Sequence, residues 1–452
     1  MAQSQINLKN DDIYSLFIKI AIPSSIGTIF QNLYSVVDSI FAGQMISESA
    51  LAAIGQIFPI YFIIIALGVG LSIGTTSLIA NSIGENNLEN SGKIFSQSFI
   101  LSIFISIVIT TLGVYFSPSI ISSITNDKET LELSIKYIHI IFFGSVFIFI
   151  LMSINSSLSA QGDTKSYRNV LIVSFFLNIF LNPLFIFGYG IFPAMGISGI
   201  AFATIFTQFL GTLYLIYKVY KTELKEFLKI NCFIPKREFI ISLLKQAVPI
   251  SFGMITISIG VFIILYFVGT FGEYAIAGYG TAIRFEQILL LPIFGLNTAV
   301  LSIAGQNFGA KNYSRVKETY YKALTIGCGF MVFGGILILL SSNYIVGLFT
   351  DNEDVILFGT SYLKVAALMG PVYPIFFITS ALIQALKKAI FTMYINLLRM
   401  IILPLVTLWF VVNVLEGGFQ SLFWGLFAIN WTFGFLVLIF SHFFMKKIFK
   451  NG

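Results

Sequence analysis

The sequence predicts an all-α integral membrane protein, with twelve transmembrane helices in two pseudo-symmetric six-helix lobes. Composition is the first reason: 57% of the 452 residues are hydrophobic and only 10% are charged. Soluble domains carry about 25% charged residues, so a mean hydropathy of +0.91 places most of this chain in lipid. The second reason is an internal repeat, in which six helices are followed by six of the same pattern. A soluble enzyme and a nucleic-acid-binding protein are thereby excluded.

Twelve apolar stretches are each long enough to cross a bilayer, whose core of about 30 Å needs roughly 20 helical residues. Short polar segments or Gly and Pro separate them. The expected spans are 15–43, 50–83, 94–117, 133–160, 169–188, 196–217, 240–270, 275–307, 319–345, 355–385, 390–414 and 420–445. The first 14 residues are polar and lack the basic-then-apolar pattern of a cleavable signal.

Lysine and arginine are concentrated in alternate connections, and this asymmetry predicts the orientation. If the N-terminus is cytoplasmic, the outward connections contain only two basic residues, Lys128 and Lys136. The outward connection at 351–354 is acidic. We therefore expect a multi-pass protein of the inner (plasma) membrane with both termini in the cytoplasm. The basic stretch 218–237 is better explained as a cytoplasmic bridge between two halves than as a nucleic-acid site.

The chain contains a partial copy of itself. KIAIPSSIGTIFQNLYSVVDSIFAG at 19–43 aligns with KQAVPISFGMITISIGVFIILYFVG at 245–269, and glycines further on repeat at an offset of 225. We expect an N-lobe at 1–220, a basic linker at 221–238 and a C-lobe at 239–452. Two parallel lobes of this kind can expose a central cleft to either side of the membrane in turn.

Asp38 breaks the repeat, because its counterpart in the second half is Ile264. A carboxylate at the bilayer centre costs at least ~2.5–3.5 kcal/mol, which makes it a functional candidate. Gln31 and Tyr34 share a helical face with Asp38 through spacings of three and four. The competing interpretation is an aspartate that only ties helices together.

Other polar residues recur on three further helices of the first half. Asn178 and Asn182 are one turn apart, Thr204 lies on the sixth span, and Asn155 lies on the fourth. Their oxygens suit Na⁺, and their hydrogen bonds suit control of proton binding at Asp38. Taken singly, each is equally well explained as a contact between packed helices.

The second half has its own charged residues, Arg284, Glu286 and Arg399, with Lys364 as a further candidate. We expect Glu286 to pair with Arg399 across helices, with a purely structural ion pair left open. In the first half, Pro23 lies fifteen residues before Asp38 on the same span, and a bend there would couple Asp38 to helix shape.

No cofactor is expected beyond a coupling ion, Na⁺ or H⁺. The chain lacks a phosphate loop of the GxxxxGK type and has no CxxC or HExxH spacing. Cys232 and Cys328 are too few for a metal site, so the one metal considered is Na⁺ at Asp38, Asn178 and Asn182. We expect no enzyme activity and no ATP-driven step by this chain alone.

Three stretches resemble the MATE (multidrug and toxic compound extrusion) family of transporters. They are LYSVVDSIFAG around Asp38, SAQGDTKSYRNVLIVSFFLNIFLNPLFIFG at 159–188, and YAIAGYGTAIRFEQILLLPIFGLNTAVLSIAGQNFGAKNYSRVKE at 274–318. The resemblance implies a cation-coupled antiporter that exports organic compounds by alternating access. It places the family's first-helix carboxylate at Asp38, its fifth-helix asparagine at Asn178 and its sixth-helix threonine at Thr204. Positions that line the family's N-lobe cavity are matched by Gln31, Tyr34 and Asn155.

The chain departs from the family pattern at three places. Asn182 stands where the family commonly has an aspartate, and Ser159 stands where it usually has an arginine. The seventh-helix glutamate of one branch is absent from PISFGMITISIG, so the chain resembles the DinF-like branch more closely. A proton relay built on two carboxylates is therefore not expected here.

These observations predict multidrug efflux: export of organic, cationic and amphipathic compounds in exchange for H⁺ or Na⁺. Its partners would be small molecules and the lipid bilayer, with no nucleic acid, and a two-lobed repeat can work as a monomer. Two alternatives remain at this point, a dedicated exporter of one endogenous metabolite and a flippase for lipids or lipid-linked sugars. The flippase would need a strongly cationic cleft, for which the second half offers few residues.

Overall fold

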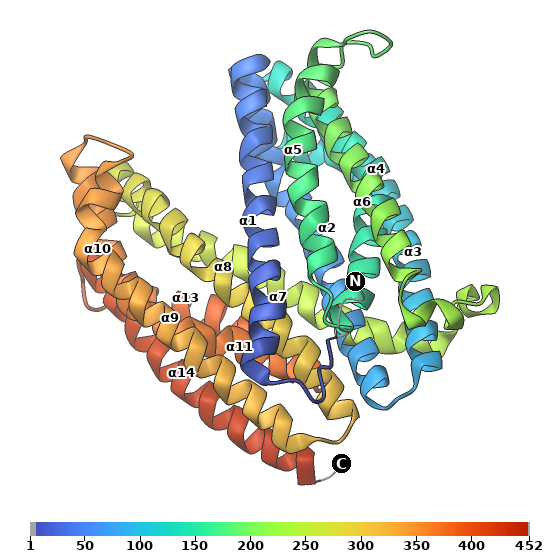
Figure 1. Ribbon diagram of the computed structural model, residues 1–452. Helices are drawn as coiled ribbons and strands as arrows, with labels where there is room; N and C mark the ends of the chain where they lie inside the picture. Colours follow the sequence, from blue (N-terminus) through green and yellow to red (C-terminus); the bar gives the residue numbers. More distant parts are fainter. Residues whose placement is uncertain (1–5, 451–452) are drawn as a thin grey trace. The chain divides into compact units, whose positions relative to one another are not determined.

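The computed structural model describes residues 6–450, which are almost entirely helical (Figure 1). Twelve helical stretches in that part of the chain are long and apolar enough to cross a membrane. The first six are α1 (Ile13–Met45), α2 (Glu48–Gly84), α3 (Leu88–Ser122), α4 (Lys128–Ala160), α5 (Lys165–Phe187) and α6 (Ile197–Val219). The prediction of an all-α multi-pass membrane protein is confirmed.

The second half repeats this series. It contains α7 (Arg237–Gly269), α8 (Glu273–Gly309), α9 (Tyr313–Gly347), α10 (Glu353–Met369), α11 (Tyr373–Ala385), α12 (Ile390–Leu397), α13 (Leu403–Asn413) and α14 (Phe419–Lys450). A short 3-10 turn, η3 (Gly370–Val372), joins α10 to α11 into one span, and a π turn, η4 (Leu398–Ile402), joins α12 to α13. Pro371 lies in the first of these turns, where the regular helical ladder is interrupted.

Equal helix lengths confirm the pseudo-symmetry of the two halves. Helices α2 and α8 have 37 residues each, and α3 and α9 have 35 each. The connections before α3 and before α9 have the same conformation. Asn86 precedes α3 and Lys311 precedes α9, both with a positive φ, and each is followed by a capping asparagine, Asn87 or Asn312. These caps satisfy backbone N–H groups at the helix start, which is why α3 and α9 begin six residues before their apolar windows.

The chain forms two compact units. We call Ile26–Ser251 the N-unit, and the described residues 6–25 together with 252–450 the C-unit. The boundaries fall inside α1 and α7, so each of these helices belongs partly to one unit and partly to the other. The lobes predicted from the repeat, 1–220 and 239–452, assign α1 and α7 whole, and that division stays a prediction.

Glycines allow the close contacts by which part of α7 packs in the N-unit and part of α1 packs in the C-unit. Within the N-unit, a Cβ on Gly70 of α2 would collide with Ser251 of α7. Within the C-unit, a Cβ on Gly295 of α8 would collide with Ser25 of α1. Gly70 and Gly295 are partners in the repeat, so both halves use the same device to pack a helix segment from elsewhere in the chain.

Each unit is organised around one deeply buried span. In the N-unit this is α4, which contacts α2, α3 and α6, and in the C-unit it is α10 with α11. Buried hydroxyls join helices in the N-unit, where Ser98 hydrogen-bonds both Thr75 at 2.8 Å and Ser153 at 2.9 Å. Polar contacts of this kind hold helices together where lipid gives no hydrophobic drive.

The basic linker packs on the N-unit. It contains two 3-10 turns, η1 (Glu223–Phe227) and η2 (Ile230–Phe233), which lie against α3. The buried amide of Gln97 on α3 donates to the carbonyls of Cys232 and Ile234, both at 2.7 Å, and accepts from the backbone N–H of Lys236 at 2.8 Å. One side chain thus fixes the path of the linker.

Candidate functional site

Asp38 lies on α1 in the N-unit with 6% of its surface exposed. Its Oδ1 accepts hydrogen bonds from the side-chain amides of Asn178 and Asn182, both at 3.0 Å. Its Oδ2 accepts one from the Thr204 hydroxyl at 3.2 Å. Both carboxylate oxygens are therefore occupied by neutral donors from α5 and α6.

The two asparagines form a unit of their own on α5. Both side chains are fully buried, and the Asn182 amide nitrogen donates to the Asn178 oxygen at 3.1 Å. Their spacing of four residues places them one helical turn apart on the face that points at α1. Each amide orients the other, so the nitrogens that face Asp38 are held in place.

A tyrosine extends the chain of hydrogen bonds beyond Asp38. The Tyr34 hydroxyl donates to Thr204 at 3.3 Å, and it shares a hydrogen bond with Thr207 at 3.1 Å. Thr204 in turn donates to Asp38, so the order is Tyr34, Thr204, Asp38. Thr207 was not among the predicted site residues. Its position three residues after Thr204, on the same face of α6, could have indicated it.

The other predicted residues of the first half lie outside this network. Gln31 is half-buried on α1 and makes none of these hydrogen bonds. Asn155 on α4 accepts from Ser159 at 3.3 Å and does not join Asp38. Pro23 is buried in the part of α1 that belongs to the C-unit, and the helix continues through it.

Within the described residues no basic side chain forms an ion pair with Asp38. The ion pairs that involve α3 and α4, such as Lys93 with Glu89 at 2.7 Å, lie near helix ends. A buried carboxylate is costly when nothing compensates its charge. The group can therefore hold a proton or a cation, and its present neighbours are two amide nitrogens and one hydroxyl.

In the C-unit the structure differs from the predicted ion pair. Buried Glu286 on α8 accepts hydrogen bonds from Tyr373 at 2.6 Å and from Tyr362, and residues 6–450 contain no ion pair between Glu286 and Arg399. The prediction of a direct pair is wrong because the two phenols occupy the carboxylate. This arrangement was not predictable from the sequence, since both tyrosines lie far from Glu286 along the chain.

Arg399 instead contacts neutral groups. Its Nε donates to Asn430 at 3.3 Å, and its guanidinium carbon lies 4.1 Å from the centre of the Phe376 ring and 5.0 Å from that of Tyr373. Tyr373 thus contacts both charged residues. Arg284 and Lys364 are exposed and do not join this cluster.

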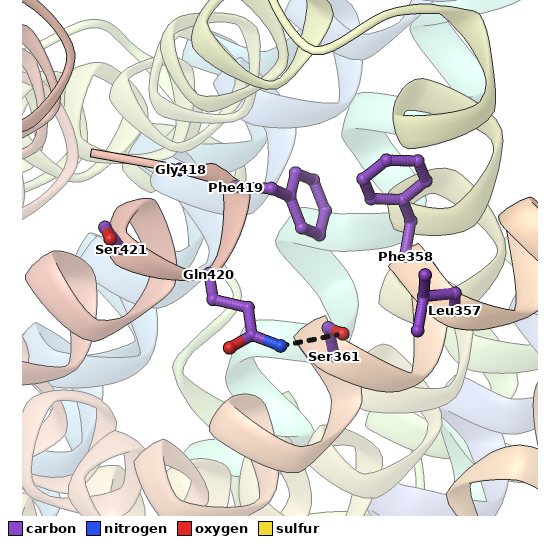
Figure 2. Close-up of a pocket in the computed structure, with 7 residues that line it drawn as sticks. All are labelled: Leu357, Phe358, Ser361, Gly418, Phe419, Gln420 and Ser421. Atoms are coloured by element: carbon purple, nitrogen blue, oxygen red, sulfur yellow. Dashed lines mark hydrogen bonds between the residues drawn. The ribbon is translucent and has the colours of Figure 1, made fainter. Parts of the chain in front are cut away.

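A cavity of about 390 Å³ lies apart from all of these residues, between α10 and the start of α14 (Figure 2). The rings of Phe358 and Phe419 pack edge to face in its lining, with their centres 4.6 Å apart, and the Gln420 amide donates to Ser361 at 3.5 Å. Its lining residues carry no charge. This cavity therefore offers no group that would exchange a proton or bind a cation strongly.

Comparison with known proteins agrees with the repeat and with the fold. The family model described as MatE matches residues 23–184 and again 249–410. The chain is 27% identical to the probable multidrug resistance protein YpnP of Bacillus subtilis, covering 89% of this chain and 86% of that protein. It is 25% identical to the multidrug export protein MepA of Staphylococcus aureus, covering 90% and 88%.

Solved structures show the same architecture. A multidrug resistance MATE family transporter in an outward-facing conformation superposes with a TM-score of 0.90 at 24% identity, over 100% of both chains. A MATE protein in a form described as bent gives 0.91, also at 24% identity, over 100% of this chain and 99% of the other. Since the family model matches most of the chain, once in each half, the protein belongs to the MATE family of membrane transporters.

Proposed function

We propose that this protein is a secondary active antiporter that exports organic, cationic and amphipathic compounds in exchange for H⁺ or Na⁺ by alternating access. Membership of the family makes small molecules the substrates, and the names of the relatives YpnP and MepA refer to multidrug resistance and export. Those names support multidrug efflux as the activity of this chain.

The observation that carries the proposal is the uncompensated charge of Asp38. Three neutral donors surround the carboxylate, and no ion pair joins it within residues 6–450. A coupling ion supplies the missing positive charge, and so does a cationic cargo. Both cannot do so at once, and this competition is the requirement for exchange.

The two candidate ions demand different rearrangements. Protonation of Asp38 needs only the reversal of one hydrogen bond, for example that with the Thr204 hydroxyl, which can donate or accept. Sodium needs oxygen ligands, so the amides of Asn178 and Asn182 would have to rotate and present their oxygens in place of the nitrogens that now face Asp38. The geometry favours H⁺ as the ion that fits with less movement.

The proposed cycle starts with Asp38 taking up the ion from outside, which weakens cargo binding. After the protein turns to the cytoplasm, the ion leaves and cargo binds. Gln31, Tyr34 and Asn155 are proposed to line the cargo path, and Pro23 to permit a bend in α1. One net charge crossing the membrane is worth about 2.3 kcal/mol per 100 mV. Exchange of one H⁺ or Na⁺ for a singly charged cation moves no net charge, so the concentration gradient of the ion drives it, and the membrane potential contributes only when the cargo has no net charge.

The proposal also includes the membrane, the orientation of the termini and the oligomeric state. The distribution of lysine and arginine supports cytoplasmic termini and insertion in the plasma membrane. Each unit has its own buried span, which supports a monomer as the working form.

The proposal is tested by efflux of a fluorescent organic cation from proteoliposomes under separately imposed H⁺ and Na⁺ gradients. The native protein is compared with Asp38→Asn and with Asp351→Asn, which removes an exposed carboxylate between α9 and α10. Gradient-driven export should be lost only in Asp38→Asn, and the gradient that drives the native protein identifies the ion. Export that persists in Asp38→Asn would refute the role of Asp38. Failure to export any test cation would favour the metabolite or lipid alternative.

A further inference from the structure

Arg399 is a cation in a membrane-spanning segment, and its acidic neighbour Glu286 interacts with it electrostatically without a direct ion pair. It lies on the span from Ile390 to Asn413, and within residues 6–450 no carboxylate forms an ion pair with it. Arginine at such a depth is costly and normally pairs with a carboxylate or faces a polar cavity. Its Nε donates to Asn430, whereas no hydrogen bond is recorded from either of its terminal NH₂ groups within the described residues.

A cavity adjoins this guanidinium. It has a volume of about 70 Å³ and is lined by residues of the C-unit alone, among them Arg399, Asn430 and the aromatic rings of Tyr279, Tyr362 and Tyr373. The space is large enough to hold water molecules. A carboxylate group also fits this volume.

The acidic residue of the neighbourhood, Glu286, acts on Arg399 through its charge and forms no hydrogen bond with it. Glu286 is occupied by the hydroxyls of Tyr362 and Tyr373, which donate to opposite oxygens of its carboxylate. Both phenolic protons point at Glu286, and the ring of Tyr373 contacts Arg399. The guanidinium therefore retains donors for an anionic group that comes from outside the protein.

Local backbone geometry supports a built site at this position. Arg399 is the second residue of the π turn η4, a rare departure from the α-helix that is frequent at functional sites. The next residue, Met400, approaches α7 so closely that a Cβ on Gly260 would collide with its carbonyl oxygen. The stacked Phe376 ring covers one face of the guanidinium. Together these contacts hold the side chain beside the cavity.

We propose that the cavity beside Arg399 binds the anionic group of a ligand, and that this group is a carboxylate carried by the exported compound. The inference rests on the proposed function and deepens it, because it assigns a contact in the C-unit to the carboxylate of a cargo that also carries a positive charge. A guanidinium binds a carboxylate through two parallel hydrogen bonds. Free chloride shares the same chemistry of a small anion and is the other source to be distinguished.

The test measures equilibrium binding to the purified full-length protein by fluorescence anisotropy. Two dyes are compared, a rhodamine that carries a free carboxylate and its methyl ester, which has the same ring system without the acid. The variants are Arg399→Gln, Arg399→Lys, and Arg237→Gln as a control at the exposed start of α7. Binding to protein-free micelles is subtracted.

We expect the native protein and Arg237→Gln to prefer the acid over the ester. Arg399→Gln should weaken binding of the acid by about tenfold and leave the ester unchanged. Arg399→Lys should fall between them, because lysine keeps the charge and loses the planar pair of donors. It also provides a folded variant if the glutamine variant does not fold.

A native protein that does not bind the acid more tightly than the ester would overturn the proposal, and so would an equal loss of both dyes in Arg399→Gln. Repetition at several chloride concentrations, with methanesulfonate as the replacing anion at constant ionic strength so that no second carboxylate is present, separates the two sources: competition by chloride against the acid alone assigns chloride as an occupant of the same anion site, and its absence assigns the cargo carboxylate. If the preference for the acid holds while gradient-driven efflux fails in proteoliposomes, the antiport proposal fails and the anion site stands.

Discussion

Asn182 donates a hydrogen bond to Asp38 over 3.0 Å, from the position where the MATE pattern commonly has an aspartate. The amide holds the carboxylate and adds no charge of its own. The site therefore carries one negative charge where a pair of aspartates would carry two. We therefore predict one coupling charge per transport cycle.

Restoring the second carboxylate should make the protein sensitive to pH. In Asn182→Asp two carboxylates would lie about 3 Å apart and could not both be ionised without a bound cation. We expect the variant to be as stable as the native protein near pH 5 and to lose melting temperature as the pH rises toward about 8. The melting temperature should fall with rising pH because the two carboxylates repel each other only when both are ionised, and both become ionised as the pH rises.

Asn182→Leu serves as the control, since it removes the same amide and adds no charge. The melting temperatures of both variants are measured by thermal unfolding across that pH range, with and without Na⁺. Parallel pH profiles for the aspartate and leucine variants would contradict the account.

Thr204 and Tyr34 should differ in importance. Thr204→Val removes the donor to one oxygen of Asp38, which leaves that buried oxygen unpaired at a cost of about 1–3 kcal/mol. Tyr34→Phe removes a donor to Thr204 and leaves all three hydrogen bonds to Asp38 in place. Initial efflux rates under a fixed gradient should fall roughly tenfold in the first variant and about threefold or less in the second. Equal losses would show that the tyrosine acts on Asp38 as directly as the threonine.

The sequence allowed the centre of this site to be predicted because its residues are rare where they occur. Asp38 stands out in an apolar span, and Asn178 and Asn182 share a face through their spacing of four. The partners of Glu286 and Arg399 were not predictable in that way. Tyr362, Tyr373 and Asn430 are separated from them by many residues, and tyrosines in a membrane span are common enough to carry no signal by themselves.

The glycines at the close helix contacts provide a prediction about stability. Gly70→Ala and Gly295→Ala each introduce a Cβ that collides with Ser251 or Ser25, and overpacking of this kind costs about 1–3 kcal/mol. The repeat supplies matched controls, Gly55→Ala and Gly280→Ala, where a Cβ meets nothing within 4 Å. We expect lower melting temperatures in the first pair and unchanged or higher ones in the second. Equal effects in both pairs would contradict the close contacts.

The path of the linker should depend on Gln97. Gln97→Leu removes three hydrogen bonds to the backbone of 232–236, so this segment should be cut by trypsin faster than in the native protein. Ser96→Ala, which removes a hydroxyl that bonds only within α3, is the control. Mass spectrometry of the fragments identifies cleavage after Lys229 or Lys236. Unchanged cleavage rates would show that the hydrophobic contacts of the linker are sufficient to hold it.

The fold was predictable because lipid imposes a simple pattern on sequence. Twelve apolar windows and the glycine repeat identified the spans, and the main differences arose at helix ends such as Leu88 and Tyr313, where polar capping residues extend the helix past its apolar part. The π turn at Arg399 was not predicted, since a single extra residue in a helical turn leaves no mark on hydropathy.

The central claim, that cargo and the coupling ion compete through Asp38, is tested most directly by counting the ions released when cargo binds. Calorimetric titration of the purified protein with an organic cation, in buffers of different ionisation enthalpy and at several Na⁺ concentrations, gives that count. The account predicts release of about one H⁺ or one Na⁺ per cargo from the native protein. It predicts none from Asp38→Asn that still binds the cargo. The same release from both proteins would contradict it.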